Sequence, residues 1–477
     1  MRLRELFDDA PAGDPPVEVT ALALDNQRVE PGSVFFCVRG FTRDGHEFAA
    51  DAIARGAVAL VVDHPLGSGV AEVVVEDVRA AMAPAAARLH GDPTATLRTI
   101  GVTGTNGKTT TAYVLRALLE AAGQPTGMLG TVKSVIGGRE RGVARTTPES
   151  IDLQASFAAM GDAGDTHCVI EVSSHALALG RADAIHWAAA IFTNLTQDHL
   201  DFHSTMDDYF AAKRRLFEMC PAVAVVNVDD PYGARLASEL DLPRVVTFGI
   251  ESGDADLRAT DVRGDFAGST FRAGGLELRS PLPGRFNVLN VLGAVATARA
   301  LGVDDETIVA ALPAAGRVPG RFEPVDEGQG FAVLVDYAHT PDSLHNVLTA
   351  ARPLTSGRLL CVFGCGGDRD RGKRPLMGEI AACLADHTIV TSDNPRSENP
   401  QAIVAEIMSG IDDRSTSEPI VDRRAAIERA VALAAPGDVV VIAGKGHEQG
   451  QELADGRRLV FDDVTVAREA LRARLVA

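Results

Sequence analysis

The chain of 477 residues is poor in cysteine, in aromatic residues and in long apolar runs. Its six cysteines form no C-x-x-C pair, so neither a disulfide framework nor a zinc site is indicated, and a reducing compartment is expected. No apolar run approaches the roughly 18 residues of a membrane span, and the N-terminal stretch turns acidic and Pro-rich before any apolar run of signal-peptide length. We therefore expect a cytoplasmic protein without a membrane anchor.

Basic residues are the minority among the charged ones. The chain has 65 acidic and 46 basic residues, which gives a formal net charge of -19. Because such a surface repels polyanions, we expect no nucleic-acid partner. An anionic small molecule can bind only where arginine, lysine, Mg²⁺ or backbone N–H groups reverse the field, so these groups should mark a functional site.

Apolar residues are abundant enough to fold the whole chain. They make up 46% of it and are spread along its length, and a typical domain size of about 150 residues suggests three domains. Gly and Pro concentrate around residues 314–322, where we place the last boundary. The predicted domains are 1–93, 94–316 and 317–477.

Short apolar segments alternate with helical patterns along the chain. Strands are expected at 33–38, 57–63 and 70–77 in the first domain. They are expected at 167–174, 188–195 and 222–230 in the second, and in FAVLVDYA, RLLCVFGC, HTIVTSD and DVVVIAG in the third. This alternation is typical of a mainly parallel sheet with helices on its faces. The predicted fold class is therefore α/β.

A glycine-rich turn, T-G-T-N-G-K-T-T, connects an apolar strand to the helix expected at 111–123. Glycines allow a tight turn whose N–H groups point at phosphate, Lys108 would reach the β- and γ-phosphates, and Thr109 would offer a hydroxyl to Mg²⁺. Val102 replaces the first glycine of the strict pattern, so this is a variant loop. We predict a nucleotide site at Gly104, Thr105, Asn106, Gly107, Lys108, Thr109 and Thr110.

The loop alone is compatible with a ligase, a GTPase switch, a kinase or an ATP-driven motor. It is followed in order by E-V-S-S-H-A-L, T-N-L-T-Q-D-H-L-D-F-H, A-A-K-R-R-L-F, G-R-F-N-V-L-N, V-P-G-R-F, D-Y-A-H-T-P-D, G-C-G-G-D-R-D-R-G-K-R-P-L-M-G, D-N-P-R-S-E and A-G-K-G-H-E. In order and spacing this set resembles the Mur ligases over essentially the whole chain.

The resemblance implies a domain for the UDP end of the substrate, a P-loop domain for ATP, and a mobile Rossmann-like domain for an amino acid. D-N-P-R together with G-K-G-H-E resembles the branch that adds meso-diaminopimelate to a UDP-N-acetylmuramoyl dipeptide. In that reaction a carboxylate attacks the ATP γ-phosphate, and the resulting acyl phosphate is converted by an amine to an amide. We expect the chain to act as a monomer.

Four residues match the family's catalytic and metal-binding positions. Glu171 ends an apolar strand, and with Thr109 it would hold one Mg²⁺. His199 matches a histidine that helps to hold a second ion. Lys213 by itself reads as a basic residue on an exposed helix face, but the resemblance implies a carbamylated lysine that binds metal. The implied catalytic set is Lys108, Glu171, His199 and Lys213.

Further matches concern ATP and the UDP-muramoyl dipeptide. Asn287 and Asn290 would lie near the adenine, and Arg321, Asp336 and His339 would close over the ribose and phosphates from the third domain. Without the resemblance, G-R-F-N reads as helix-entry chemistry with an Asn cap, and T-T-P as a cap followed by Pro in the first turn. The matched contacts for the UDP-muramoyl dipeptide are His46, Thr146, Thr147, Ser173 and Arg181, and Asn26 can hydrogen-bond where the family has a serine that serves UDP.

For the amino acid, Arg396 is the informative residue, because meso-diaminopimelate differs from lysine by a second carboxylate that a guanidinium can bind through two hydrogen bonds. A buried, unpaired arginine would reject lysine by about 2 to 5 kcal/mol. The alternative for D-N-P-R is a simple turn. The other residues matched around the same zwitterion are Arg369, Asp393, Asn394, Gly444 and Glu448.

The match is weakest at the UDP end, where Asn26 and Gln27 stand in place of the family's Ser-Arg. Gln27 removes a cation there, which keeps open a related ligase with another acceptor. A lysine-adding ligase is a further alternative, against which Arg396 argues. A P-loop protein that binds nucleotide without ligation is a third reading. Phosphate release that depends on all the substrates together would separate a ligase from that reading.

Overall fold

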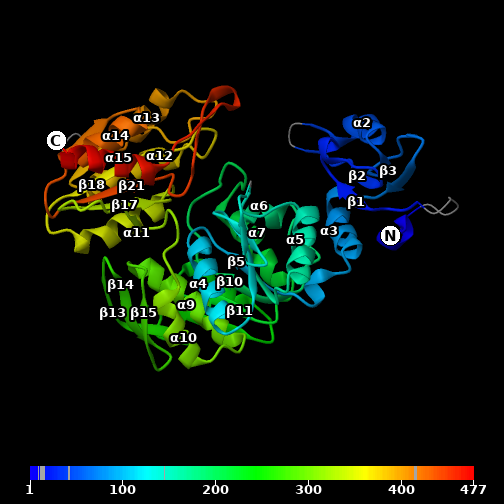
Figure 1. Cartoon of the computed structure of the whole chain (residues 1–477), viewed down its shortest axis with the longest axis horizontal. Coiled ribbons are helices and arrows are strands. Elements are labelled where there is room, and N and C mark those ends of the chain that lie inside the picture. Colours follow the sequence, from blue (N-terminus) through cyan, green and yellow to red (C-terminus); the bar gives the residue numbers. More distant parts are fainter. Residues whose placement is uncertain (9, 11–16, 41–42, 144, 413–415, 477) are drawn as a thin grey trace.

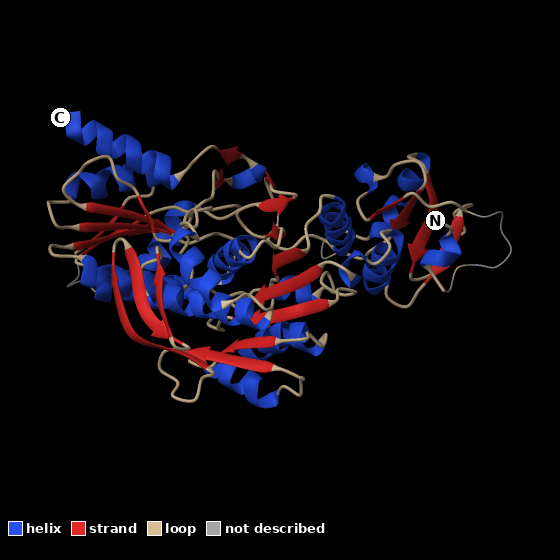
Figure 2. Cartoon of the chain, turned by 60° about the horizontal axis from the view of Figure 1, so that its bottom comes forward, coloured by secondary structure: helices blue, strands red, loops and turns tan. Residues whose placement is uncertain are grey.

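The computed structural model describes all residues except 9, 11–16, 41–42, 144, 413–415 and 477. Figure 1 shows three α/β bodies along the long axis, with the N-terminal and C-terminal ones at opposite ends of the central one. Figure 2 shows their strands gathered into separate sheets with helices packed against them. The predicted α/β class is confirmed, whereas the boundaries at 93/94 and 316/317 stay predictions.

The first sheet has four parallel strands in the order β1-β2-β3-β4. Its strands are short, and alternate residues enter two apolar clusters, one on each face. The predicted strands at 33–38, 57–63 and 70–77 are confirmed with slightly narrower bounds. The elements are α1 (Leu3–Leu6), β1 (Ala21–Ala23), β2 (Ser33–Phe36), α2 (Ala49–Ala54), β3 (Ala57–Val62), β4 (Ala71–Val74) and α3 (Val78–Leu89).

The central sheet has eleven strands, and its parallel core has the order β12-β11-β10-β5-β9-β6. β5 lies between β10 and β9, so the turn that follows it opens at the carboxyl edge of the sheet, where ligands of such folds bind. The core strands are β5 (Arg98–Thr103), β6 (Thr126–Leu129), β9 (His167–Glu171), β10 (Trp187–Phe192), β11 (Ala224–Asn227) and β12 (Val245–Gly249).

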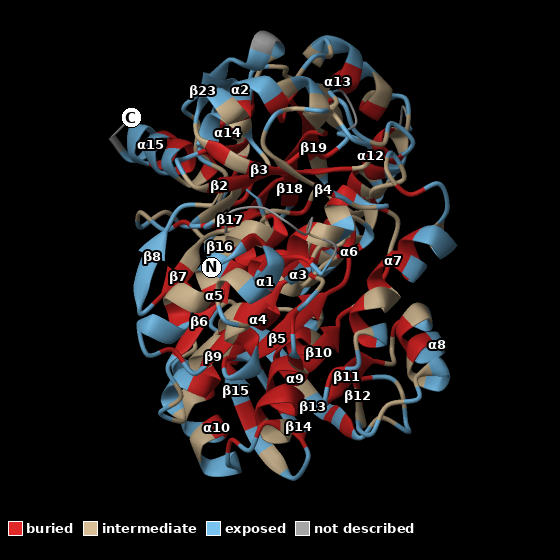
Figure 3. Cartoon of the chain, turned by 90° about the vertical axis from the view of Figure 1, so that its right-hand side faces the viewer, coloured by how far each residue is buried: buried red, intermediate tan, exposed pale blue. Residues whose placement is uncertain are grey.

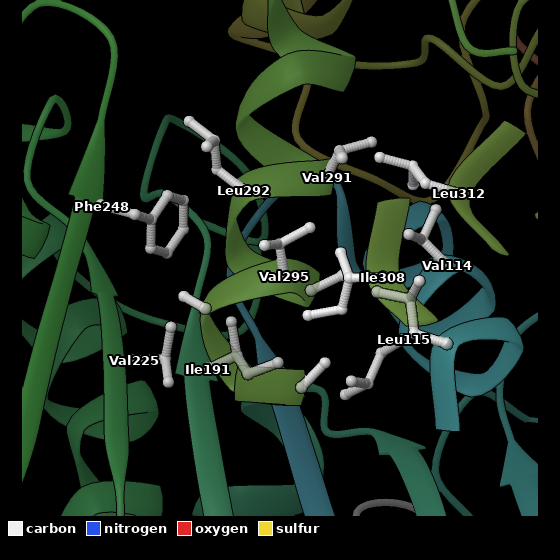
Figure 4. Close-up of a cluster of buried hydrophobic side chains, with 14 of the residues drawn as sticks. Val114, Leu115, Ile191, Val225, Phe248, Val291, Leu292, Val295, Ile308 and Leu312 are labelled. Carbon is white, nitrogen blue, oxygen red and sulfur yellow. The ribbon is translucent and has the colours of Figure 1, made fainter. Parts of the chain in front are cut away.

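Helices cover both faces of this sheet because alternate strand residues point to opposite sides. Val169 packs on one face, and its neighbours Cys168 and Ile170 pack on the other. Figure 4 shows the first core, where Val291 and Val295 lie between the strand residues and Val114 and Leu115. The helices are α4 (Lys108–Ala121), α9 (Arg285–Ala300) and α10 (Asp305–Ala311) on that face, and α5 (Ser150–Asp162), α6 (Ser174–Ala178), α7 (Met206–Glu218) and α8 (Pro231–Glu239) on the other.

Antiparallel strands at both edges of the central sheet were not foreseen. Beyond β6, the strands β7 and β8 continue the sheet in antiparallel pairing. Beyond β12, β13 pairs with it in parallel, and β14 and β15 then follow in antiparallel pairing. β8 and the end of β13 are exposed and polar, which explains why the pattern missed them, whereas Phe271, Ala273 and Leu278 alternate with exposed charged residues in the next two strands and were a usable signal. These strands are β7 (Ser134–Ile136), β8 (Arg139–Arg141), β13 (Leu257–Asp265), β14 (Gly268–Ala273) and β15 (Leu276–Ser280).

The third sheet has six strands in the order β16-β17-β21-β18-β19-β20, all parallel except β16. Its four predicted strands are confirmed as β17 (Ala332–Asp336), β18 (Leu359–Phe363), β19 (His387–Val390) and β21 (Val439–Ala443). Helices α11 (Pro341–Ala351), α12 (Lys373–Leu384) and α13 (Pro400–Met408) cover one face, and α14 (Arg423–Leu433) and α15 (Asp463–Val476) the other. The short strands are β16 (Glu323–Pro324), β20 (Ser417–Pro419), β22 (Gln451–Glu452) and β23 (Arg458–Leu459).

Burial follows this layering. Figure 3 shows the central strands buried and the outer surfaces of helices such as α8 and α10 exposed. Among the described residues, no helix is long and apolar enough to cross a membrane. Polar residues that are nonetheless buried, such as Glu171 and Lys213, therefore call for a specific explanation.

Candidate active site

A cavity of about 890 Å³ lies where the carboxyl edge of the central sheet faces the third domain. The phosphate loop forms one wall, and residues from β17 and α11 form another. Fourteen predicted site residues line it: Thr105, Asn106, Gly107, Lys108, Thr109, Thr110, Thr146, Glu171, Ser173, His199, Asn290, Arg321, Asp336 and His339.

The phosphate loop needs its glycines. Gly104 and Gly107 have φ angles of 146° and 86°, and a Cβ atom would lie 1.8 Å from Thr193 Oγ1 at the first position and 2.1 Å from Asn290 Oδ1 at the second. Lys108 Nζ donates to the carbonyl oxygens of Gly104 and Thr105 at 2.9 and 2.8 Å. Burial lowers the pKa of Lys108, while the Glu171 carboxylate opposes that shift.

Glu171 is the last residue of β9 and is fully buried. Its Oε2 accepts hydrogen bonds from Thr109 Oγ1 at 2.9 Å and Thr131 Oγ1 at 3.0 Å, and its Oε1 accepts from the Thr131 N–H at 2.8 Å. Thr146 Oγ1 lies 3.1 Å from Thr131 Oγ1. The result is a cluster of hard oxygen donors directly behind the phosphate loop. Thr131 was missed by the sequence reasoning because nothing in its segment marks it.

Lys213 is not on an exposed helix face. It is 1% exposed, its Nζ donates to the Gly104 carbonyl at 2.8 Å, and it lies 4.5 Å from the centre of the Tyr209 ring. Burial lowers the pKa of Lys213 far below its usual value, and the nearby Lys108 cation adds to that shift. The reading from periodicity alone is therefore wrong, because α7 turns this side chain into the site.

His199 has a φ of 55°, in the left-handed region that non-glycine residues rarely adopt, and its Nε2 lies 3.3 Å from Asp198 Oδ2. Burial lowers the pKa of His199 to about 3, so the ring is neutral, which is the form that binds metal. Asp198 also pairs with His339 at 3.7 Å and Lys373 at 3.8 Å, both from the third domain. Asp198 was missed, although its position beside His199 was a usable signal.

The third domain touches the phosphate loop directly. Arg321 Nη2 donates to Thr109 Oγ1 at 3.3 Å, and Asn106 Nδ2 donates to Asp342 Oδ2 at 2.9 Å. Asp336 accepts from the Phe322 N–H at 2.6 Å, and burial raises its pKa. The two bodies thus close one site between them.

Two alternatives based on helix caps are wrong. The N-cap of α9 is Gly284, without a capping side chain, and Asn287 instead donates to the Pro283 carbonyl at 2.8 Å and accepts from Asn290 Nδ2 at 3.2 Å. Asn290 therefore faces the cavity, and Asn287 supports it from behind. Helix α5 begins after Glu149, so the T-T-P segment lies outside it.

The residues matched to the UDP-muramoyl dipeptide fall into two groups. In the first group, Thr147 Oγ1 donates to the Glu171 carbonyl at 2.8 Å and accepts from the Ser173 N–H at 3.0 Å. Arg181 Nη2 lies 2.9 Å from Glu149, a carboxylate that also pairs with Arg79 at 3.0 Å and Arg145 at 2.8 Å. Glu149, missed by the sequence reasoning, thus joins α3 of the first domain to the central domain.

Asn26 and His46 form the second group and do not line the large cavity. Both lie in the first domain, where Asn26 Nδ2 donates to Asp51 at 2.7 Å and His46 Nδ1 lies 2.6 Å from Asp44 Oδ1. Arg28, next to Gln27, pairs with Asp152 of the central domain at 2.8 Å. The structure therefore keeps these two residues apart from the phosphate loop.

Arg396 has partners within the protein itself, which the sequence did not indicate. Its Nε donates to Glu452 Oε2 at 3.0 Å and its Nη1 to the Gly367 carbonyl at 2.8 Å, so the guanidinium is already paired and is only partly buried. The hairpin β22–β23, which the sequence pattern did not reveal, brings Glu452 to it. Arg396 lines a separate cavity of about 360 Å³ in the third domain.

Other residues matched to the amino acid gather next to Arg396. Glu448 Oε2 accepts from Asn394 Nδ2 and Lys445 Nζ, each at 2.9 Å. Gly444 has a φ of 117°, and a Cβ there would lie 2.7 Å from Asp393 Oδ2. Lys445, in the middle of G-K-G-H-E, was missed although it is fully buried. Arg369 is exposed and donates to the Asp368 carbonyl at 2.9 Å.

Comparisons with known proteins agree with this arrangement. Three family models match: Mur ligase family, catalytic domain at residues 18–90, Mur ligase middle domain at 102–298, and Mur ligase, glutamate ligase domain at 320–446.

Named UDP-N-acetylmuramoyl-L-alanyl-D-glutamate–2,6-diaminopimelate ligases resemble the chain along nearly its whole length. The one from Syntrophomonas wolfei is 46% identical, covering 96% of both chains, and the one from Solibacter usitatus is 48% identical, covering 95% of this chain and 94% of the relative. A solved structure of a ligase with that name superposes with a TM-score of 0.71 at 35% identity, covering 100% of this chain and 99% of the other. The chain therefore belongs to the Mur ligase family.

Proposed function

We propose that this chain is an ATP-dependent ligase that joins 2,6-diaminopimelate to UDP-N-acetylmuramoyl-L-alanyl-D-glutamate, in the synthesis of peptidoglycan precursors. The observation that carries the proposal is the buried cluster at the phosphate loop, where Thr109 donates to Glu171 and Lys213 donates to the Gly104 carbonyl. The names of relatives at 46% and 48% identity support the choice of substrates.

The reaction brings two anions together. A carboxylate oxygen of the acceptor attacks the γ-phosphorus of ATP, ADP leaves, and an acyl phosphate forms. The amine of diaminopimelate then attacks the acyl carbon, phosphate leaves, and the amine loses a proton. Positive charge around the phosphates, in a site that excludes water, lowers the cost of both encounters. Lys108, at the start of α4, is the protein's own cation for this task.

The donor atoms around the loop fit Mg²⁺. Carboxylate and hydroxyl oxygens are its preferred ligands, and Glu171 and Thr109 offer both within hydrogen-bond distance of each other. We propose that these two hold one ion and that His199 and a carbamylated Lys213 hold a second. When bound, Mg²⁺ supplies positive charge to the phosphates.

Carbamylation of Lys213 is proposed on the basis of its surroundings. Carbon dioxide adds only to a neutral amine, and burial beside Lys108 lowers the pKa of Lys213 strongly enough to favour that form. As the N–C bond forms, the nitrogen releases a proton to solvent, so the product is an anion and exchanges repulsion by Lys108 for attraction. The neutral His199 ring is suited to bind the same ion.

We propose a division of labour among domains 1–93, 94–316 and 317–477. Asn26 and His46 of the first would serve the UDP end, and the Glu149-bound Arg181 would serve an acidic part of the acceptor. Arg321, Asp336 and His339 would close over ATP from the third. Diaminopimelate would lie in the third domain, near Arg369, Asp393, Asn394, Arg396, Gly444 and Glu448.

Phosphate release from the purified protein tests the proposal. A diaminopimelate ligase releases phosphate only when ATP, Mg²⁺, the UDP-muramoyl dipeptide and diaminopimelate are all present. Equal release with lysine in place of diaminopimelate would favour the lysine-adding alternative. Turnover of ATP that is indifferent to both acceptor and amino acid would instead identify a nucleotide-dependent protein without ligase activity.

A further inference from the structure

Two histidines and a carboxylate meet in the first domain, away from the cavity at the phosphate loop. His46 lies in the short 3-10 helix at Gly45–Phe48, and Asp63 and His64 follow β3 directly. One ligand atom from each lies within 4.8 Å of the other two. In the described part of the chain, these three form a group of His, Cys, Asp or Glu side chains close enough together to hold a metal ion.

The hydrogen bonds of His46 prepare one of its nitrogens to bind a cation. Its Nδ1 lies 2.6 Å from Asp44 Oδ1, and because an ionised carboxylate only accepts, Nδ1 carries the proton. In the neutral ring Nε2 therefore keeps its lone pair. This nitrogen lies 3.2 Å from Asp63 Oδ1 and accepts a long hydrogen bond from the Asp63 N–H at 3.5 Å, and a bound metal would displace that bond. A histidine held by a carboxylate through one nitrogen, with the other free to ligate, is the usual arrangement around protein-bound metals.

The remaining geometry also suits a small cation. His64 Nδ1 lies 2.5 Å from the same Asp63 oxygen, and the two imidazole rings have centroids 4.8 Å apart. Arg39 Nε binds the other oxygen of Asp63 at 2.7 Å, and its Nη2 donates to Oδ1 at 3.3 Å, so the guanidinium orients the carboxylate and shares Oδ1 with the histidines. A metal at this point would replace the direct contact between His64 and Asp63.

Exposure gives the site a closed side and an open side. The side chain of His46 is 8% exposed, that of Asp63 24% and that of His64 52%. His46 is thus fixed in the domain, whereas His64 can adjust at the surface and admits an ion from solvent. Two imidazoles and one carboxylate form a donor set typical of Zn²⁺ and similar transition metals rather than of Mg²⁺.

We propose that His46, Asp63 and His64 form a binding site for a divalent transition-metal ion such as Zn²⁺, separate from the Mg²⁺ sites at the phosphate loop. Solvent water would complete the coordination. The sequence gave no sign of this site. Its ligands are not cysteines, and they come from two separate segments that only the fold brings together. His46 is also one of the residues that the proposed function assigns to the UDP end of the acceptor, but the binding test below does not depend on ligase activity.

The test is a titration of the full-length protein with Zn²⁺ against a chromophoric chelator, in excess Mg²⁺ to occupy the hard-donor sites. One ion should bind to the wild type and be lost, or bind at least about tenfold more weakly, in His64→Ala and Asp63→Asn. Asp44→Ala should weaken binding by about tenfold, because it removes the partner that orients His46. His186→Ala, which removes an exposed histidine outside the cluster, is the matched control and should bind as the wild type does.

Substituting Co²⁺ gives a second readout. Visible absorption bands of nitrogen- and oxygen-bound Co²⁺ should appear in the wild type and in His186→Ala, and should be lost in His64→Ala. The proposal is overturned if the wild type binds no ion tightly, or if His64→Ala retains the stoichiometry, affinity and spectrum of the wild type. Exposed His64 can be removed without disturbing the core, so a folding defect would not mask either result.

Discussion

Lys108 Nζ and Lys213 Nζ donate hydrogen bonds to the same acceptor, the carbonyl oxygen of Gly104, at 2.9 and 2.8 Å. Two ammonium groups that share one carbonyl inside a protein repel each other strongly, and each has its pKa lowered by burial. The arrangement is relieved if one of the two loses its positive charge. Lys213 is the better candidate, because the Glu171 carboxylate favours the charged form of Lys108, whereas Asp198 favours the charged forms of both lysines.

This pairing predicts the behaviour of Lys213→Ala. We expect ligase activity to fall by at least about a hundredfold, in line with the loss of a group that stabilises developing charge. A short carboxylate such as acetate should restore part of it by occupying the place of the carbamate. Arg214→Ala, which removes a partly exposed arginine on the same helix, should retain activity. Full activity of Lys213→Ala without added carboxylate would rule out the carbamate role.

Arg396→Ala tests amino-acid recognition. Loss of the guanidinium should lower kcat/KM for diaminopimelate by at least about thirtyfold, the effect of losing a desolvated charge pair of about 2 kcal/mol or more. The KM for ATP should stay nearly constant, because Arg396 lines the separate cavity of the third domain. Arg371→Ala removes an exposed arginine paired with Glu406 and serves as the control. Equal changes in the kinetics of both substrates would show that the assignment of Arg396 is wrong.

Glu149→Gln tests the ion-pair cluster that joins the first domain to the central domain. The carboxylate holds Arg181 at 2.9 Å and Arg79 at 3.0 Å, so its neutralisation should loosen the arginine that we assign to the acceptor. We expect the KM for the UDP-muramoyl dipeptide to rise by about tenfold, equivalent to about 1.4 kcal/mol, with kcat little changed. Glu120→Gln is the control: it removes a carboxylate that pairs with Arg116 on helix α4, away from Glu149, and should leave the KM for the UDP-muramoyl dipeptide unaltered. A fall in kcat alone would indicate a different role.

His167→Gln tests a pH dependence of stability. Burial lowers the pKa of His167 to about 4, and Arg98 adds to the shift, so the folded protein resists protonation of this ring. A folded-state pKa below the unfolded value of 6.5 means that stability is fully present above about pH 6.5 and falls as the pH drops toward 4. Between about pH 7.5 and pH 5 the wild type should lose about 2 kcal/mol more than the variant in denaturant unfolding of the central domain. Parallel losses in the two proteins would exclude His167 as the cause.

Periodicity and turn chemistry in the sequence were sufficient for most of the buried parallel strands and for the phosphate loop, but not for the edge strands. The apolar segments at 33–38 and 167–174 became β2 and β9 because a buried strand needs only a short apolar run between turn signals. The phosphate loop could be predicted from the sequence because its backbone at Gly104 and Gly107 leaves no room for a side chain, so these positions must be glycine. Resemblance to the Mur ligases then supplied roles that no local pattern contained.

Tertiary structure alone decided which polar residues meet. Local sequence placed Lys213 on an exposed face, and it is buried because α7 packs against the loop although Lys213 and Gly104 lie 109 residues apart in the chain. It also decided that Arg396 is paired with Glu452, that Glu149 joins two domains, and that His46 meets His64. A local sequence fixes the tendency of a segment to form a helix, strand or turn. The electrostatic state of a side chain depends on distant charges and on exclusion of water, and both exist only after the chain has folded.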